Sequence, residues 1–312
     1  MTSTLPFTAR TTAEQVLDGV DLAGRRIVVT GGASGIGAET ARVLARAGVE
    51  VTVAVRDPAR AAALVAELPP GSVRVAALDL ADLDSVAAFA SDWQGPLDVL
   101  VANAGVMAIP ERRVTATGWE LHLATNYLGH FALATALHGH LRAAGRSRLV
   151  VVSSGAHRDA PFDFADPQFE HRPYDRWTAY GQSKTADVLL AVGAARRWAA
   201  DGVTANAVNP GWVMTGLQRH VDDATMKAMG AMDEHGEIIE QPYSKTLAEG
   251  AAASVLLAGS PLALDLTGRY VEDNRVAPTV RPGDDQPGGV AAHAVDPEAA
   301  ERLWEYGSRA LG

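Results

Sequence analysis

The chain has 312 residues, of which 47% are hydrophobic and 21% are charged, and this composition is typical of a folded globular protein. A net charge of -10 and the lack of a Lys/Arg-rich run argue against a nucleic-acid surface. The absence of cysteine excludes disulfides, thiolate catalysis and cysteine-ligated metals. No apolar run reaches the roughly 18 residues of a membrane span, and residues 1–15 lack a signal-peptide pattern. We therefore expect a soluble cytoplasmic protein without a membrane partner.

Short apolar runs alternate along the chain with longer segments rich in alanine and leucine. The runs predict strands at 26–30, 50–55, 73–78, 97–102, 148–153, 203–208 and about 268–272. The longer segments predict helices at 36–47, 57–67, 82–93, 117–143, 176–200 and 245–258. Continuously apolar strands suit a parallel sheet covered on both faces. The alternation predicts an α/β fold, a single Rossmann-type doubly wound domain with a seven-stranded, mostly parallel sheet and helices on both faces.

Three segments lie outside this alternation but within the single predicted domain, residues 1–312. Residues 1–24 are expected to form an N-terminal extension, and residues 212–245, named the lid below, are expected to cover the substrate. Residues 273–295 are rich in proline and glycine, which indicates irregular structure, and 296–311 resemble a capped helix. Residues 273–312 would then form a C-terminal tail.

The stretch TGGASGIG at residues 30–37 lies between the first predicted strand and the first predicted helix. Such a loop can cradle a phosphate, because glycine lets the backbone approach closely and the following helix N-terminus attracts an anion. A Walker A loop would need Lys and then Ser or Thr where Ala38 and Glu39 stand. The G-x-x-x-G-x-G spacing also differs from G-x-G-x-x-G. On these letters alone, a loop that only packs the helix against the strand remains the alternative.

Five further motifs follow in order along the chain. They are Asn103-Ala104-Gly105 after the fourth strand, Asn126 in NYLGHF, Ser153-Ser154 at the end of the fifth strand, Tyr180-x-x-x-Lys184 in a helix, and Pro210-Gly211 after the sixth strand. With the glycine loop, they resemble the short-chain dehydrogenase/reductase family over about residues 20–272. The lead-in before TGGASGIG and the 26-residue spacing from Ser154 to Tyr180 resemble the retinol-dehydrogenase-like or protochlorophyllide-reductase-like branch.

The resemblance implies a catalytic set of Asn126, Ser154, Tyr180 and Lys184. Tyr180 would donate or accept the proton, and because a free tyrosine has a pKa of about 10, it needs the Lys184 cation one helical turn away to favour tyrosinate. Ser154 would bind the substrate oxygen, although its neighbour Ser153 is an alternative. The Asn126 carbonyl would hold a relay water; otherwise Asn126 is a helix-interior residue that bonds its own backbone.

The resemblance also implies an NAD-type dinucleotide. Val55 stands at the end of the second strand, where NAD-binding proteins place an acidic residue, and Arg56 can bind a 2′-phosphate. We therefore expect NADP(H) rather than NAD(H), unless Asp57 binds the ribose instead of capping the next helix. The expected cofactor-binding residues are Gly31, Ala33, Ser34, Gly35, Ile36, Gly37, Arg56, Asp79, Leu80, Asn103, Ala104, Gly105, Tyr180, Lys184, Pro210, Gly211, Val213 and Thr215.

Two segments are expected to shape the substrate site, 155–177 and the lid. The first carries Phe162, Phe164, Phe169, Tyr174 and Trp177, and the second carries Trp212, Leu217 and four methionines. Flexible methionines suit an adaptable apolar pocket, so we expect a fairly bulky, apolar carbonyl or secondary alcohol. His157, His171, His220 and His235 lie in these segments without a metal-binding spacing, and we expect no metal.

The sequence therefore predicts an NADP-dependent oxidoreductase with a small-molecule substrate. The alternatives are a reductase of an activated C=C or C=N bond, and a non-catalytic scaffold that senses NADP(H). The resemblance implies a homodimer or homotetramer built on helices 117–143 and 176–200, unless the insertion at 155–177 blocks that surface.

Overall fold

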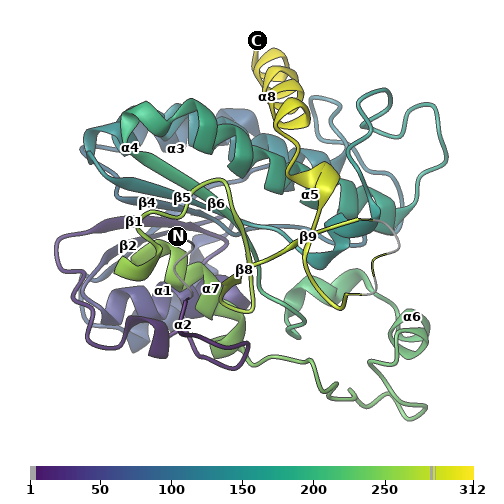
Figure 1. Cartoon of the computed structure of the whole chain (residues 1–312), viewed down its shortest axis with the longest axis horizontal. Coiled ribbons are helices and arrows are strands. Elements are labelled where there is room, and N and C mark those ends of the chain that lie inside the picture. The colour runs from purple at the N-terminus through teal and green to yellow at the C-terminus, as the bar shows by residue number, and fades with distance from the viewer. Residues whose placement is uncertain (1–4, 282–283, 285) are drawn as a thin grey trace.

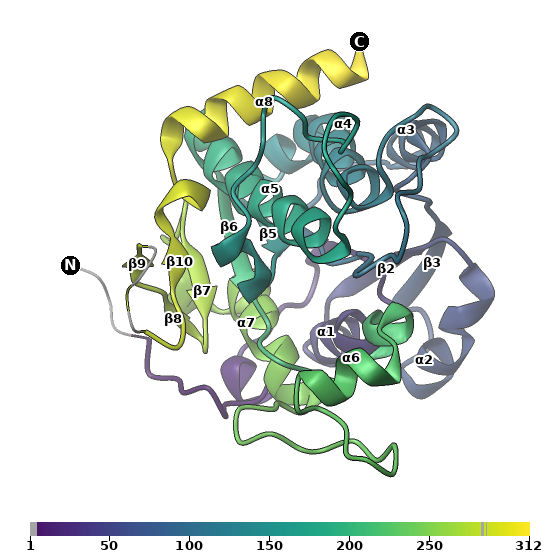
Figure 2. The ribbon, with the colours of Figure 1, turned by 90° about the vertical axis from the view of Figure 1, so that its right-hand side faces the viewer.

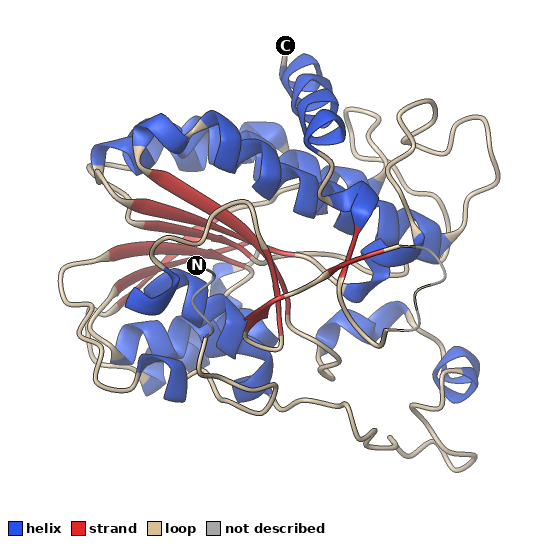
Figure 3. Cartoon of the chain, in the orientation of Figure 1, coloured by secondary structure: helices blue, strands red, loops and turns tan. Residues whose placement is uncertain are grey.

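One twisted sheet lies between two layers of helices (Figures 1 and 3). The computed structural model describes residues 5–281, 284 and 286–312. Residues 1–4 of the expected N-terminal extension, and residues 282, 283 and 285 of the expected tail, lie outside the described residues. The described helices include none that is long and apolar enough to cross a lipid bilayer.

The sheet has the strand order β3-β2-β1-β4-β5-β6-β7-β8. The strands are β1 (Arg26–Thr30), β2 (Glu50–Val55), β3 (Val73–Ala77), β4 (Val99–Ala102), β5 (Ser147–Val152), β6 (Val203–Asn209), β7 (Tyr270–Glu272) and β8 (Arg275–Val276). All neighbouring pairs are parallel except β7 and β8. This order places the carboxyl ends of β1, β4, β5 and β6 at one edge of the sheet, where ligands of doubly wound folds bind.

The sheet has eight strands, so the expectation of seven strands was wrong by one. The chain turns back at Asp273 and Asn274, which both have a positive φ (51° and 60°), and β8 then pairs antiparallel with β7. Asp and Asn tolerate this left-handed conformation better than most residues. The expectation of irregular structure over 273–295 was also too coarse, because β8 is followed by a separate parallel pair, β9 (Thr279–Val280) and β10 (Val290–Ala291).

Helices cover both faces, as expected. Figure 1 shows α1 (Gly35–Arg46), α2 (Ala62–Glu67) and α7 (Leu247–Gly259) below the sheet, and α3 (Leu83–Asp92), α4 (Gly129–Ala143) and α5 (Arg176–Arg197) above it. The alternation of side chains along the strands produces two apolar cores. In β1, Val28 faces the core that contains Phe131 and Leu189, whereas Ile27 and Val29 face the core that contains Leu44.

The helix predicted at 117–143 begins later than expected. The Glu120 carboxylate accepts hydrogen bonds from the backbone N–H groups of His122 (3.1 Å) and Leu123 (2.9 Å). A π-helix, Leu123–Leu128, then leads directly into α4. Insertions of this kind are frequent at functional sites, and this one contains Asn126.

The C-terminal helix α8 (Pro297–Leu311) packs across α5 and α4 (Figure 2). The Trp304 ring contacts Phe131 edge-on at a centroid distance of 5.0 Å and Trp198 at 5.3 Å. The insertion at 155–177 reaches the same helix, since the ring centres of Phe162 and Tyr306 are 5.9 Å apart. These contacts cover part of the α4–α5 surface on which we expected oligomers to form.

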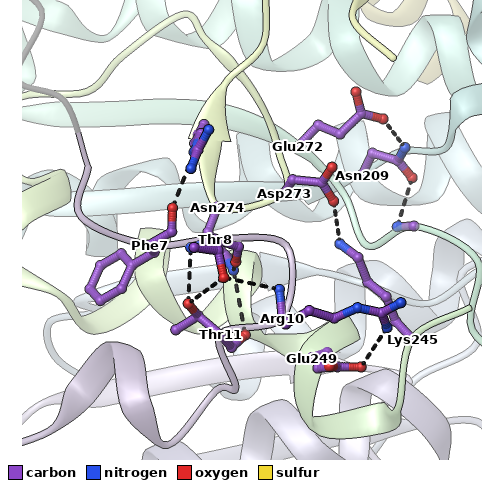
Figure 4. Close-up of polar contacts among 12 residues, drawn as sticks. Phe7, Thr8, Arg10, Thr11, Asn209, Lys245, Glu249, Glu272, Asp273 and Asn274 are labelled. Carbon is purple, nitrogen blue, oxygen red and sulfur yellow. Dashed lines mark hydrogen bonds and ion pairs between the residues drawn. The ribbon is translucent and has the colours of Figure 1, made fainter. Parts of the chain in front are cut away.

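The N-terminal extension fastens the end of the lid to the sheet (Figure 4). Arg10 donates hydrogen bonds to the carbonyl oxygens of Ser244 (2.6 Å) and Pro242 (2.5 Å). Lys245, the last lid residue, pairs with Asp273 at 2.6 Å in the β7–β8 turn. The lid contains a short helix, α6 (Asp223–Ala228), between this anchor and the sheet.

Candidate active site

The glycine loop has no room for side chains at its key positions. Gly31 and Gly35 have φ values of 67° and 56°, a conformation that L side chains rarely adopt. A Cβ on Gly37 would lie 2.4 Å from Asn103 Nδ2 and 2.6 Å from the Gly31 oxygen. The loop brings bare backbone to the N-terminus of α1, where free N–H groups and the helix dipole favour an anion.

A buried hydrogen-bond network ties this loop to the π-helix. The Thr30 hydroxyl accepts hydrogen bonds from the backbone N–H groups of Asn103 (2.9 Å) and Ala104 (3.0 Å), and lies 2.9 Å from His130 Nε2. On the other side of its ring, His130 Nδ1 lies 2.8 Å from the Asn126 carbonyl oxygen. A neutral His130 that donates from Nδ1 satisfies every contact, and burial lowers its pKa to about 4.

Asn126 lies directly beside Lys184 rather than bonding its own helix. Its side chain accepts from Val106 N–H (2.9 Å) and donates to the Val106 oxygen (3.0 Å) and to Ser183 Oγ (2.8 Å). A Cβ on Gly105 would be 3.2 Å from Asn126 Oδ1 and 3.6 Å from Lys184 Nζ. The alternative in which the Asn126 side chain bonds the backbone of its own helix is therefore wrong.

Tyr180 and Lys184 lie on one face of α5, as their spacing predicts. Lys184 Nζ is 5.9 Å from the centre of the Tyr180 ring, and both residues are buried. Burial lowers the pKa of Lys184, but Asp187 and Tyr180 raise it by more, so the net shift of this pKa is upward. Lys184 is thus a buried cation on the same helix face as Tyr180.

The two serines at the end of β5 point in different directions. The Ser153 hydroxyl is buried and donates to the Lys184 backbone oxygen at 2.8 Å. Ser154 is only partly buried, and its oxygen accepts from the Ala156 N–H at 3.2 Å at the start of a short 3₁₀ helix. Ser153 is therefore committed to positioning α5, and Ser154 is the serine that can face a substrate.

Three arginines gather beyond the end of β2. Partial burial, followed by the charges of Arg56 and Arg60, lowers the pKa of Arg219. Arg219 comes from the lid and donates to the Gly216 oxygen at 2.9 Å. Asp57 accepts from Ala59 N–H at 3.1 Å and caps the 3₁₀ turn Pro58–Ala61. A basic cluster in a chain of net charge -10 is suited to a multiply charged anion.

Comparison with known proteins shows which family this chain belongs to. The family profile for short chain dehydrogenases matches residues 25–225. This protein belongs to the short-chain dehydrogenase family. It is 65% identical over 295 residues to a protein of Streptomyces lividans named "Probable oxidoreductase", covering 94% of this chain and 99% of that one. It is 36% identical to human retinol dehydrogenase 12 over 300 residues, 94% of this chain and 88% of that one. These relatives confirm the oxidoreductase assignment and the retinol-dehydrogenase-like branch.

Solved structures of other proteins share the fold. An uncharacterized protein from Mycobacterium paratuberculosis has a TM-score of 0.71 and 34% identity, covering 93% of this chain and 94% of that one. An NADP complex of Pseudomonas aeruginosa RhlG has a TM-score of 0.62 and 26% identity, covering 81% and 96%. This short-chain dehydrogenase therefore has the Rossmann-type fold expected from its sequence.

The remaining expected cofactor residues of this short-chain dehydrogenase lie along the same edge of the sheet. The Leu80 side chain is buried in the core, and Asp79 accepts from Ala81 N–H at 3.0 Å, so only their remaining polar groups are available to an adenine. Val213 is buried against Gly250, and Thr215 caps the 3₁₀ helix Gly216–His220. A Cβ on Gly35 would lie 3.3 Å from Thr215, so the start of the lid touches the glycine loop.

Tyr180 packs within an apolar cluster. Tyr180 packs with Met107 and Ala108, and with Trp177, Leu217 and Val221 at the margin. Phe162 and Phe164 instead pack in the core near α8, Phe169 lies under Arg172, and Tyr174 donates to the Ile109 oxygen. Of the aromatic residues that we expected in the 155–177 segment, Trp177 is therefore the one that reaches the Tyr180 cluster.

His157 is a buried residue that links two distant segments of the chain. Its Nδ1 lies 2.7 Å from the backbone carbonyl oxygen of Ser154, and its Nε2 accepts a hydrogen bond from the Ala291 N–H at 3.1 Å. Burial lowers the pKa of His157 to about 4. Sequence reasoning missed this link between the tail and the loop of Ser154, because its two ends are far apart in the chain.

Proposed function

We propose that this protein transfers hydride between NADP(H) and the carbonyl or secondary alcohol of a fairly bulky apolar compound. The observation that carries the proposal is the buried Tyr180–Lys184 pair, with Nζ 5.9 Å from the ring centre, and the apolar cluster in which Tyr180 packs. The family supplies the reaction type, and the apolar margin of Trp177, Leu217 and Val221 supports the substrate class.

The site fits a dinucleotide in two places. The loop at Gly31, Gly35 and Gly37 is a cradle that side chains would fill, and it lies at a helix N-terminus suited to a pyrophosphate. The basic cluster of Arg56, Arg60 and Arg219 suits a ribose 2′-phosphate. When bound, the nicotinamide ring would supply or accept the hydride.

Each catalytic side chain has a role that its contacts support. Tyr180 gives its hydroxyl proton to the substrate oxygen during reduction and takes it back during oxidation. Lys184 favours tyrosinate by its charge, and Ser154 donates a hydrogen bond to the substrate oxygen. Asn126 bonds Ser183, the residue before Lys184, and offers its carbonyl, which His130 already contacts, to a relay water.

The preference for NADP(H) rests on the arginines and on Asp57. The contact of Asp57 with Ala59 N–H supports capping rather than ribose binding. Because hydrogen bonds to charged groups contribute about 1.5–3 kcal/mol, Arg56→Ala should weaken NADPH binding by roughly 10- to 100-fold and leave NADH binding unchanged. Isothermal titration with both cofactors measures this, and Arg142→Ala on the exposed end of α4 is the control. Unchanged NADPH affinity in Arg56→Ala would contradict the preference.

The substrate class is tested by NADPH oxidation with a series of ketones of increasing apolar bulk. We expect kcat/KM to rise with bulk, since apolar area buried against Trp177 and Leu217 contributes to binding. Turnover confined to small charged carbonyls would contradict the proposal. Parallel assays with activated alkenes and imines separate carbonyl reduction from reduction of C=C or C=N bonds.

A further inference from the structure

Lys184 is paired with a buried carboxylate on its own helix. Asp187 lies three residues further along α5, and its Oδ2 is 2.8 Å from Lys184 Nζ. The side chains of Lys184 and Asp187 are only 5% and 1% exposed. The other Asp187 oxygen, Oδ1, is buried without a hydrogen-bond partner among the described residues. A carboxylate that only served the fold would be expected to have both oxygens satisfied.

The pair fixes the direction of the Lys184 side chain. Nζ donates one hydrogen bond to Asp187 and a second to the Val152 oxygen at 3.0 Å. An ammonium group has three donors, so one remains for the cofactor or a water. The cation is thus held by a carboxylate and a carbonyl, and it lies 5.9 Å from the centre of the Tyr180 ring.

The groups that face this pair from the surrounding elements are few. Tyr180 lies on α5, Tyr127 and Asn126 on the π-helix, and His130 on α4. Tyr180 itself is faced by His122, with ring centres 6.2 Å apart, and by Tyr270 on β7. Burial raises the pKa of Tyr127 and lowers that of His130, so both are neutral around pH 7. From β5, Ser153 and Val152 contribute an uncharged hydroxyl and a carbonyl.

Among these groups, Asp187 is therefore the one that can offset the charge of Lys184. Burial raises the pKa of Asp187 to about 7 although the Lys184 ammonium opposes that shift, so Asp187 offsets the Lys184 charge above about pH 7. An uncompensated cation near Tyr180 stabilises tyrosinate strongly. A cation that is paired with a carboxylate stabilises tyrosinate less.

We propose that Asp187 is a positioning residue that orients Lys184 and partly cancels its charge, and so sets the pH range in which Tyr180 transfers its proton. This inference rests on the proposed function, in which Tyr180 is the proton donor and acceptor. Asp187 acts through Lys184 and has no contact with the substrate.

The direct test is the pH profile of kcat for alcohol oxidation in wild type and Asp187→Asn. Asparagine keeps the shape and removes the charge, so the uncompensated Lys184 cation should favour tyrosinate. We expect the midpoint of the profile to move to lower pH by about one unit. Asp166→Asn is the matched control, because Asp166 is a buried carboxylate that accepts backbone hydrogen bonds in the 155–177 segment. An identical midpoint in wild type and Asp187→Asn would overturn the proposal.

A second measurement does not require turnover. The near-ultraviolet absorbance of tyrosinate, taken as the difference from the same protein carrying Tyr180→Phe, reports the ionisation of Tyr180 itself. The same downward shift is expected in Asp187→Asn and, if that variant is unstable, in Asp187→Ala. Failure of both variants to fold would show a structural role and overturn the proposal. Absence of any Tyr180-dependent turnover in wild type would instead contradict the proposed function, and the absorbance titration would still decide the role of Asp187.

Discussion

The floor of the site and the lid are built in different ways. The floor, formed by the glycine loop, the π-helix and α5, is linked by hydrogen bonds of Thr30, His130 and Asn126, although Asp187 Oδ1 on α5 has no partner among the described residues. The lid exposes large apolar side chains, namely Met214, Met229, Ile238, Ile239 and Tyr243. The difference teaches that the catalytic geometry is held in place by the fold, whereas the lid retains apolar surface that a substrate can cover.

The lid is attached at both ends, and between them Asp222 and Thr225 bond Arg176 of α5. At its start, Thr215 lies against Gly35, and at its end, Arg10 and Lys245 join it to the N-terminal extension and the β7–β8 turn. We infer that substitutions in the floor change stability and chemistry, and that substitutions at the lid anchors change substrate binding.

The largest effect is expected from Gly37→Ala in the floor. Its Cβ would collide with backbone and with Asn103, which cannot move without breaking the bond of its Nδ2 to the Thr30 oxygen. We expect a loss of about 3 kcal/mol in the free energy of unfolding and loss of NADPH binding. Gly216→Ala in the lid, where a Cβ meets nothing within 4 Å, is the matched control for chemical denaturation. Equal stability of the two variants would remove the distinction between floor and lid.

Acid should destabilise the fold through two buried histidines, His130 on α4 and His157 in the 155–177 segment. His130 and His157 have a folded pKa of about 4, below the ordinary value of about 6.5. The unfolded state therefore binds protons more readily, and stability falls as pH drops from about 6.5 towards 4. Between pH 7.5 and 5, each histidine should reduce the free energy of unfolding by about 2 kcal/mol.

Urea unfolding at several pH values measures this slope. His157→Gln should lose about half of the histidine contribution, whereas His235→Gln, at an exposed lid position, should behave as wild type. A flat profile from pH 7.5 to 5 in wild type would show that these rings are not buried as neutral groups.

The smallest effect is expected at the lid anchor. Arg10→Ala removes the bonds to Ser244 and Pro242, so the lid should order less readily over a substrate. We expect a rise of roughly three- to ten-fold in KM for the substrate, equivalent to about 1 kcal/mol, with NADPH affinity unchanged. Arg46→Ala removes the exposed pair with Glu14 and serves as the control. If Arg10→Ala weakened NADPH binding instead, Arg10 would support the floor of the site rather than the lid.

Local patterns in the sequence predicted the parts of the site that local chain geometry determines. The glycine loop follows a strand, and Tyr180 and Lys184 share a helix face, so neighbouring letters are enough to place them. The roles of His130, His157 and Arg219 were missed, because each depends on a partner from a distant segment. His130 stood within the quoted NYLGHF motif, but nothing near Arg219 in the sequence indicated Arg56 or Arg60.

The extra strand and the covered helix face were missed for a similar reason. The β7–β8 turn depends on Asp273 and Asn274 adopting a positive φ, which their letters permit but do not require. The α8 helix was predicted from its capped pattern, but its docking through Trp304 onto Phe131 and Trp198 is a tertiary contact.

The most direct measurement of the proposed chemistry is NADPH oxidation by Tyr180→Phe with the best ketone of the series. Phenylalanine keeps the ring in the Met107–Ala108 cluster and removes the hydroxyl that gives the proton. We expect kcat to fall by about 10³-fold, within the usual range for general acid catalysis, while the Kd for NADPH changes by less than about two-fold, since the arginine cluster is intact. Turnover that survived at the wild-type rate would contradict the assignment of Tyr180 and the mechanism built on it.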